Sequence, residues 1–127
     1  MDRIPNITES ELKIMNILWE EYPLTSNEII DKLDGYNDWS CTTIRTFISR
    51  LVNKSAIRID ITKKDYLYYP NISHKNFLKK QNKSFLNTVY NGSCDLLFKY
   101  LIEDDSITDE ELDKFEKIIE KKKDHQL

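Results

Sequence analysis

Hydrophobic residues recur at helical spacing over most of the chain, with one short alternating stretch near the middle. The first helix is predicted from about Glu9 to Glu21, and the second from about Ser26 to Leu33, ending at Asp34-Gly35. A third helix is predicted after Ser40, which can cap it. Its apolar side comprises Ile44, Phe47, Ile48, Leu51 and Val52.

One signal for a helix start occurs three times along the chain. In this capping box, a threonine hydroxyl accepts from the backbone N–H three residues later, and the glutamate there accepts from the threonine N–H. Each occurrence also has an apolar residue before the cap and another four residues into the helix, which form a hydrophobic staple. The three boxes are Thr8 with Glu11, Thr25 with Glu28, and Thr108 with Glu111.

The alternating stretch follows the third helix directly. Ile57, Ile59 and Ile61 alternate with polar residues, and a second run, Tyr66–Tyr69, ends at Pro70. Between them lies Thr62-Lys63-Lys64-Asp65, which predicts a β-hairpin with a basic tip. Three short helices followed by such a hairpin are typical of a winged helix-turn-helix.

From Ser73 onward the pattern is helical again, with helices predicted to about Asn91-Gly92, over Asp95–Ile102 and from Asp109 to about Lys122. The middle helix is apolar nearly all round, and such a helix must be covered on every side. Residues 73–127 are too few to cover it, so we expect a second copy of the chain to do so. The residues expected at the dimer interface are Phe85, Val89, Leu96, Leu97, Tyr100, Leu101, Leu112, Phe115 and Ile119.

The predicted fold class is therefore mainly α with a small β-hairpin. We expect residues 1–72 to form a winged helix-turn-helix DNA-binding domain. We expect residues 73–127 to form a helical dimerisation domain. With 127 residues, the chain is long enough for two small domains.

Charge is distributed unevenly in a way that favours a nucleic-acid partner. The whole chain has a net charge of −3. Between Trp39 and Lys64, however, six Lys or Arg face a single acid, Asp60, for a local net charge of +5. Because binding responds to the field within a Debye length of about 8 Å, this local excess outweighs the total.

The third helix is the predicted DNA-reading element, because its outer face lacks acids and carries threonines where a recognition helix meets base edges. The alternative is an ordinary solvated face. The indole of Trp39 can donate to a phosphate or be packed in the core, and both interpretations stay open. The residues expected to face bases are Thr42, Thr43, Arg45 and Thr46, and those expected to meet phosphates are Arg50, Lys54, Lys63, Lys64 and Trp39.

Other chemistry has little support in the sequence. His74 and His125 lack ligands at helical spacing and are interpreted as surface residues, and Cys41 and Cys94 are too few for a disulfide framework or thiolate metal site. We expect no metal, no cofactor and no enzymatic activity. The chain has no apolar run near 18 residues and no signal core at its start, which predicts a cytoplasmic protein without membrane insertion.

Several segments in order resemble the penicillinase repressor (BlaI/MecI) family of bacterial transcription regulators. They are TESELKIMNILWE, DWSCTTIRTFISRLVNK, YLYYP, FLNTVYNG and ITDEEL. The resemblance implies a homodimer that binds a palindromic operator of a β-lactam-resistance regulon. It also implies a sensor-linked protease that inactivates the repressor by cutting it in the dimerisation region, here between Tyr100 and Leu101.

The sequence departs from the family pattern at three places. The usual Ser-Pro-Lys-Thr is Ser40-Cys41-Thr42-Thr43, the usual Lys-Gly is Lys54-Ser55, and the usual Asn-Phe cut pair is Tyr100-Leu101. The first departure predicts a changed operator preference, because a lysine contact is lost. Two alternatives to the main hypothesis remain: a winged-helix protein-interaction module, and a related repressor that answers a different signal.

Overall fold

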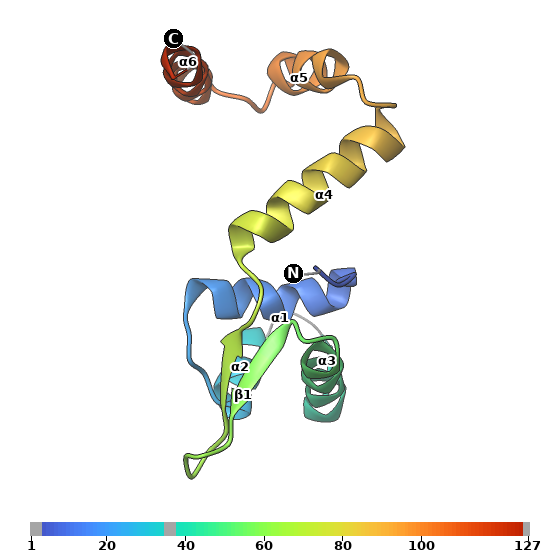
Figure 1. The fold of residues 1–127 in the computed structure, drawn as a ribbon, viewed down its shortest axis with the longest axis vertical. Helices are drawn as coiled ribbons and strands as arrows, with labels where there is room; N and C mark the ends of the chain where they lie inside the picture. The colour runs from blue at the N-terminus through green and yellow to red at the C-terminus, as the bar shows by residue number, and fades with distance from the viewer. Residues whose placement is uncertain (1–3, 35–37, 126–127) are drawn as a thin grey trace. The chain divides into compact units, whose positions relative to one another are not determined.

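A computed structural model of the chain describes residues 4–34 and 38–125. The chain divides into two compact units, Met1–Lys80 and Gln81–Leu127. The elements in order are α1 (Glu9–Glu20), α2 (Ser26–Leu33), α3 (Cys41–Asn53), β1 (Ile57–Asp60), β2 (Leu67–Pro70), α4 (His74–Val89), α5 (Cys94–Glu103) and α6 (Asp109–Asp124). The winged helix-turn-helix layout and the mainly helical fold class are confirmed, and Figure 1 shows α2, α3 and the hairpin on the same side of α1.

All three predicted capping boxes are present. In the first, the Thr8 N–H donates to Glu11 Oε1 at 2.9 Å, and the Glu11 N–H donates to the Thr8 hydroxyl at 3.2 Å. The boxes at Thr25 and Thr108 repeat this arrangement. Each satisfies donors that a helix start would otherwise leave unpaired. The predicted glycine cap at Gly35 lies outside the described residues.

The core of the first unit is formed where the apolar sides of the three helices meet. Ile14, Met15 and Leu18 of α1 are completely buried, and so are Ile29 of α2 and Leu51 of α3. Burying a side chain of this size contributes about 1.5–3 kcal/mol each relative to leaving it exposed. The core therefore fixes α3 with its apolar side inward and its polar side outward.

The hairpin pairs Ile57 with Pro70 and Asp60 with Leu67 in antiparallel register. It is shorter than predicted, and Ile61 lies beyond the strand with 64% of its surface exposed. The physical reason is a turn: Asp60 Oδ1 accepts from the backbone N–H of Thr62 at 2.9 Å and from its hydroxyl at 2.6 Å. An aspartate that bonds the backbone two residues on competes with strand pairing.

The start of α4 packs within the first unit. Phe77 is buried, and the His74 ring stacks on Trp19 with centroids 4.5 Å apart. The Trp19 indole N–H donates to the Ile72 carbonyl at 2.9 Å. The first compact unit therefore includes the start of α4 and ends at Lys80, and the division into two functional domains after residue 72 stays a prediction. His74 is exposed as expected, but one face of its ring is covered by Trp19.

The second unit contains the end of α4, followed by α5 and α6. Asn91 (φ 51°) and Gly92 (φ 82°) both adopt the left-handed conformation after α4, and the Gly92 N–H donates to the Leu86 carbonyl at 2.9 Å. This confirms the predicted end of the helix near these two residues. Among residues 81–125, all of which the structure describes, no side chain is buried.

Within residues 4–34 and 38–125, no helix is long and apolar enough to span a membrane.

Candidate nucleic-acid interface

The interface is built on the outer face of α3. Ser40 caps this helix by accepting from the Thr43 N–H at 3.1 Å, and its hydroxyl lies 3.0 Å from that of Thr43. Ile44, Ile48 and Leu51 are buried, so the opposite side of the helix faces solvent. The exposed residues on it are Thr42, Arg45, Thr46, Ser49, Arg50 and Asn53, while Thr43 is half-buried.

The threonine hydroxyls of α3 are held by local hydrogen bonds. The Thr46 hydroxyl donates to the Thr42 carbonyl at 3.0 Å. Its proton is then engaged, but the oxygen keeps lone pairs that can accept from a donor outside the helix. In the major groove of DNA, such donors are the amino groups of adenine and cytosine.

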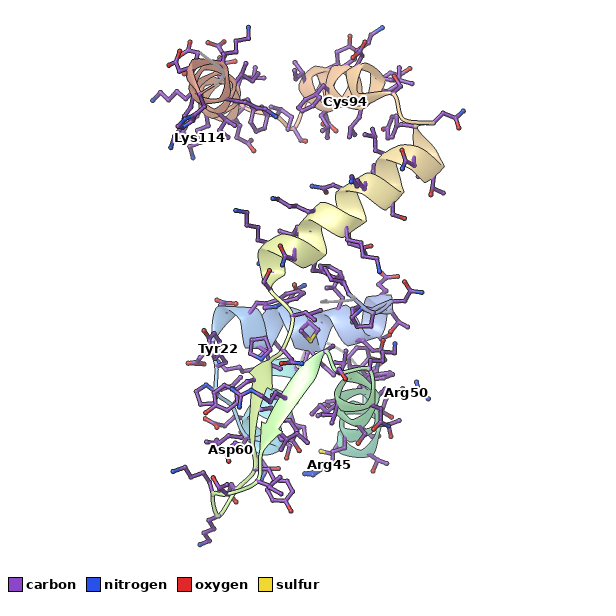
Figure 2. All side chains as sticks on the ribbon, in the orientation of Figure 1. Tyr22, Arg45, Arg50, Asp60, Cys94 and Lys114 are labelled. Atoms are coloured by element: carbon purple, nitrogen blue, oxygen red, sulfur yellow. The ribbon has the colours of Figure 1, made fainter. Side chains whose placement is uncertain are left out.

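The two arginines of α3 are held in different ways. Arg45 Nη2 donates to Asn27 Oδ1 at 3.0 Å, which ties the guanidinium to the start of α2. The Arg50 guanidinium lies 5.9 Å from the centre of the Phe47 ring. Figure 2 shows both side chains extending away from α3. The sequence pattern singled out both arginines but missed Asn27, since a polar residue in the first turn of a helix is common.

Lys54 differs from the other predicted phosphate contacts. Its ammonium lies 2.5 Å from Glu11 Oε1 and 2.9 Å from the Asn6 carbonyl oxygen. Glu11 is only 1% exposed. Burial raises the pKa of Glu11, but the hydrogen bonds from Lys54 and Thr8 outweigh it and hold the pKa below its ordinary value. Lys54 thus neutralises the buried carboxylate of Glu11. The sequence pattern predicted a DNA phosphate as its partner and did not indicate Glu11.

The hairpin forms the second part of the interface. Lys63 and Lys64 are exposed at its tip, as expected for a basic wing. The Thr62 hydroxyl and backbone N–H donate to Asp60 and lower its pKa, so this carboxylate stays ionised; Asp65 is a second acid, next to Lys64 at the tip. Arg58 lies over the Tyr69 ring at 4.2 Å from the centroid. Arg58 is exposed and is one of the six cations between Trp39 and Lys64, but it was not among the residues predicted to contact DNA.

Trp39 packs mainly against protein. Its ring lies 5.0 Å from that of Phe47 in an edge-to-face arrangement, and Lys13 Nζ lies 5.3 Å from its centroid. It is half-buried at the edge of the core. This geometry favours the packing interpretation, and a phosphate contact from the indole N–H stays a prediction.

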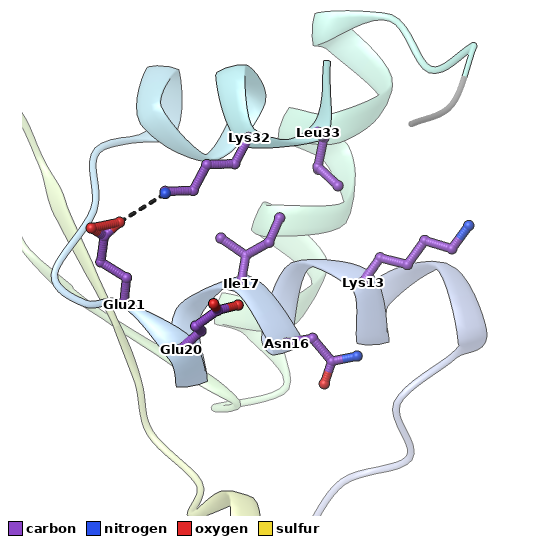
Figure 3. Close-up of a pocket in the computed structure, with 7 residues that line it drawn as sticks. All are labelled: Lys13, Asn16, Ile17, Glu20, Glu21, Lys32 and Leu33. Atoms are coloured by element: carbon purple, nitrogen blue, oxygen red, sulfur yellow. Dashed lines mark ion pairs between the residues drawn. The ribbon is translucent and has the colours of Figure 1, made fainter. Parts of the chain in front are cut away.

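Two cavities border the first unit. A groove of about 270 Å³ lies between the start of α2 and the wing, with Asn27 and Lys64 in its lining. A larger cavity of about 640 Å³ lies between α1 and α2, where Lys32 pairs with Glu21 at 2.8 Å (Figure 3). That ion pair raises the pKa of Lys32. The larger cavity is lined by two acids, Glu20 and Glu21, and two cations, Lys13 and Lys32, and none of its lining residues belongs to α3 or the wing.

No metal site accompanies this surface. In the part of the chain that the structure describes, no three His, Cys, Asp or Glu side chains are grouped so as to hold a metal ion. The exposed chemistry consists of hydroxyls, guanidinium groups and ammonium groups, all of which suit the polar edges and phosphates of DNA.

Comparison with known sequences identifies the family. The family described as penicillinase repressor matches residues 7–121. The penicillinase repressor of Bacillus licheniformis is 32% identical over 123 residues, covering 97% of this chain and 96% of the relative. The methicillin resistance regulatory protein MecI of Staphylococcus aureus is 32% identical over 116 residues, covering 91% of this chain and 94% of the relative.

Solved structures give the same result for the first unit. The solution structure of the DNA-binding domain of the repressor BlaI aligns with a TM-score of 0.53 at 33% identity, covering 60% of this chain and 93% of that one. The solution structure of monomeric Bacillus licheniformis BlaI in complex with the blaP half-operator aligns with the same score, identity and coverage. The first relative is named as a repressor and the second as a regulatory protein, and neither is named as an enzyme. The chain therefore belongs to the penicillinase repressor family.

Proposed function

We propose that this protein is a homodimeric transcriptional repressor that binds palindromic operator DNA of a β-lactam-resistance regulon. The observation that carries the proposal is the exposed, acid-free face of α3 beside a basic wing. Membership of a family whose relatives are repressors supports it, as does the 33% identical structure solved with a half-operator. Operator binding places the site of action in the bacterial cytoplasm.

Each part of the interface has a distinct role in this proposal. Side chains of α3 read base edges in the major groove, and the cations around them contact phosphates. Lys54 is left out because its ammonium is bound to Glu11. The residues proposed to read bases are Thr42, Thr43, Arg45 and Thr46, and those proposed to contact phosphate are Arg50, Lys63 and Lys64.

The second unit supplies the proposed dimer contact. Phe85, Val89, Leu101 and Ile119 expose between 47% and 61% of their surface in the single chain. Many large apolar side chains exposed in one unit favour an interaction site, and a second copy is the partner that a palindromic site requires. The remaining proposed interface residues are Leu96, Leu97, Tyr100, Leu112 and Phe115.

Derepression by proteolysis is the proposed response to β-lactam. The bond between Tyr100 and Leu101 lies within α5, and the two residues are 55% and 47% exposed in the single chain. A protease needs extended backbone, so this turn of α5 must open before it is cut. A sensor-linked protease is the proposed partner, and cleavage would separate the DNA-binding unit from part of the dimer surface.

An electrophoretic mobility shift titration tests the proposal. The full chain is titrated against the DNA upstream of its own gene and against a shuffled duplex of equal length and composition. We expect binding to the upstream duplex to be at least about 1,000-fold tighter, as in other specific repressors. Equal affinity for the two duplexes at moderate salt contradicts operator recognition and favours a winged-helix module with another partner.

A further inference from the structure

Glu11 lies in a buried network that joins the start of α1 to the end of α3. Its carboxylate accepts from the Thr8 N–H at 2.9 Å and from Lys54 Nζ at 2.5 Å. Lys54 also donates to the Asn6 carbonyl oxygen at 2.9 Å. The carboxylate is 1% exposed, so nearly all of its stabilisation comes from these protein donors.

Lys54 is well placed to hold α3 because it is the C-terminal cap of that helix. Its backbone N–H donates to the Arg50 carbonyl at 2.9 Å, while its side chain extends to α1. The next residue, Ser55, has φ 64°, so the chain leaves α3 abruptly at this point. The last turn of α3 is therefore connected to α1 through a charged hydrogen bond as well as through core packing.

A buried charge pair of this kind is more sensitive to geometry than apolar packing is. Removing one partner leaves the other charge without compensation, and the structure must rearrange to hydrate it. A rearrangement that displaces Lys54 shifts the C-terminal end of α3, and because the helix moves as a rigid rod, it also shifts Arg45, Thr46 and Arg50 further along it. A displacement near 1 Å is enough to misalign a hydrogen bond to a base edge.

We propose that Glu11 is a positioning residue for DNA binding: it fixes the recognition helix α3 through Lys54 and keeps the Lys54 ammonium away from the phosphates. This inference rests on the proposed role of α3 in reading DNA. It assigns Glu11 an influence on sequence recognition although its side chain is buried. It also assigns Lys54 the role of holding α3 to α1, whereas Lys63 and Lys64 are proposed to contact phosphates.

The first experiment compares Glu11→Gln with Glu9→Gln in the full chain. Glu9 is exposed in the same first turn of α1, so this control removes the same charge without touching α3. The probes are a duplex selected by the parent protein from a random library and a shuffled duplex of the same composition. Circular dichroism at the binding temperature checks that the parent and both variants are folded to the same extent.

For Glu11→Gln we expect affinity for the selected duplex to fall about tenfold, the loss expected from one misaligned base contact. Affinity for the shuffled duplex should not fall below that of the Glu9→Gln control, because phosphate contacts tolerate small displacements and the released Lys54 ammonium can only add to them. Equal losses on both duplexes overturn the proposal, because they indicate a smaller active fraction and not a misplaced helix.

The second experiment measures the salt dependence of binding to the selected duplex for Lys54→Met and Lys64→Met. Each lost phosphate contact lowers the slope of log affinity against log salt by about 0.9. We expect this loss for Lys64→Met and an unchanged slope for Lys54→Met. A slope lowered by about 0.9 in Lys54→Met makes Lys54 a phosphate contact and overturns the proposal.

The double variant Glu11→Gln/Lys54→Met covers the case in which a single variant does not fold, because it leaves no buried charge unpaired. We expect its affinity for the selected duplex to equal that of the weaker single variant and its salt slope to equal that of the parent. Multiplied losses, or a lowered slope, overturn the proposal. If the parent itself prefers no selected sequence, the proposed function and this inference both fail.

Discussion

In the proposed complex, Thr46 on α3 reads a base and Arg50 contacts a phosphate. The Thr46 hydroxyl donates to the Thr42 carbonyl, which leaves its oxygen as an acceptor and its methyl as an apolar contact. Arg50 packs beside Phe47 and keeps a charge that phosphate attracts at any sequence. The two residues are therefore expected to affect binding in different ways.

Replacing each of these residues with alanine separates the two roles. Thr46→Ala should change base preference by about 1 kcal/mol, or roughly fivefold, at one position of each half-site. Arg50→Ala should weaken binding to all duplexes and lower the salt slope by about one. Competition binding against single-base operator variants measures both effects. Equal losses on every variant for both substitutions would show that the assignment of roles is wrong.

The sequence predicted contacts between neighbouring residues but not contacts between residues far apart in the chain. The capping threonines and glutamates were predicted correctly because their partners lie three residues apart. The partner of Glu11 lies 43 residues away, and that of Asn27 lies 18 residues away. Such pairs depend on how α1, α2 and α3 pack, which local spacing does not specify. The same limit applies to Lys54, whose pairing with Glu11 local spacing does not indicate and whose phosphate contact stays a prediction.

At the scale of elements, the α1–α3 connection through Glu11 predicts a pH dependence of stability. The pKa of Glu11 is lower in the folded chain than its ordinary value of 4.5, so the folded state binds the proton less readily than the unfolded state does. Stability from this group is therefore complete above pH 4.5 and is lost as the pH falls through the lower folded pKa.

This pH dependence can be measured by chemical denaturation between neutral and acidic pH. The free energy of unfolding of the parent should fall more steeply below pH 4.5 than that of Glu11→Gln, which cannot titrate at this position. Glu9→Gln, changed in the same turn, should keep the parental slope. Parallel curves for the parent and Glu11→Gln would exclude a contribution from the buried pair.

Elements also differ in how well periodicity predicted them. The helices were predicted to within a few residues because their apolar spacing and caps agree. The hairpin was predicted too long, because Ile61 continues the alternation although the Asp60–Thr62 turn has already ended the strand. In this segment, a local side-chain hydrogen bond outweighed the hydrophobic pattern.

For the molecule as a whole, the two units bury their apolar residues differently. The first unit has a closed core, whereas no side chain is buried among residues 81–125, which the structure describes. Each large apolar side chain that a partner covers contributes about 1.5–3 kcal/mol, and because association itself is costly, the proposed dimer needs several of them. Periodicity predicted this surface because α5 is apolar on nearly every side.

Sedimentation velocity at micromolar concentration tests the dimer. The parent should sediment as a dimer, and Leu101→Asp as a monomer, because burying an unpaired aspartate costs at least about 3 kcal/mol, or over 100-fold in the dissociation constant. Asn82→Asp introduces the same charge at an exposed polar position and should remain dimeric. A monomeric parent would remove the proposed role of the second unit.

In the proposed complex, two copies of α3 read the two halves of a palindromic operator, and hydroxyl-radical footprinting of the upstream DNA locates both of them. We predict two protected patches related by two-fold symmetry, with centres about 34 Å or slightly more apart along the duplex. Both patches should disappear together for the Arg45→Ala/Thr46→Ala variant. Uniform protection, or a footprint that this variant leaves intact, would contradict this arrangement.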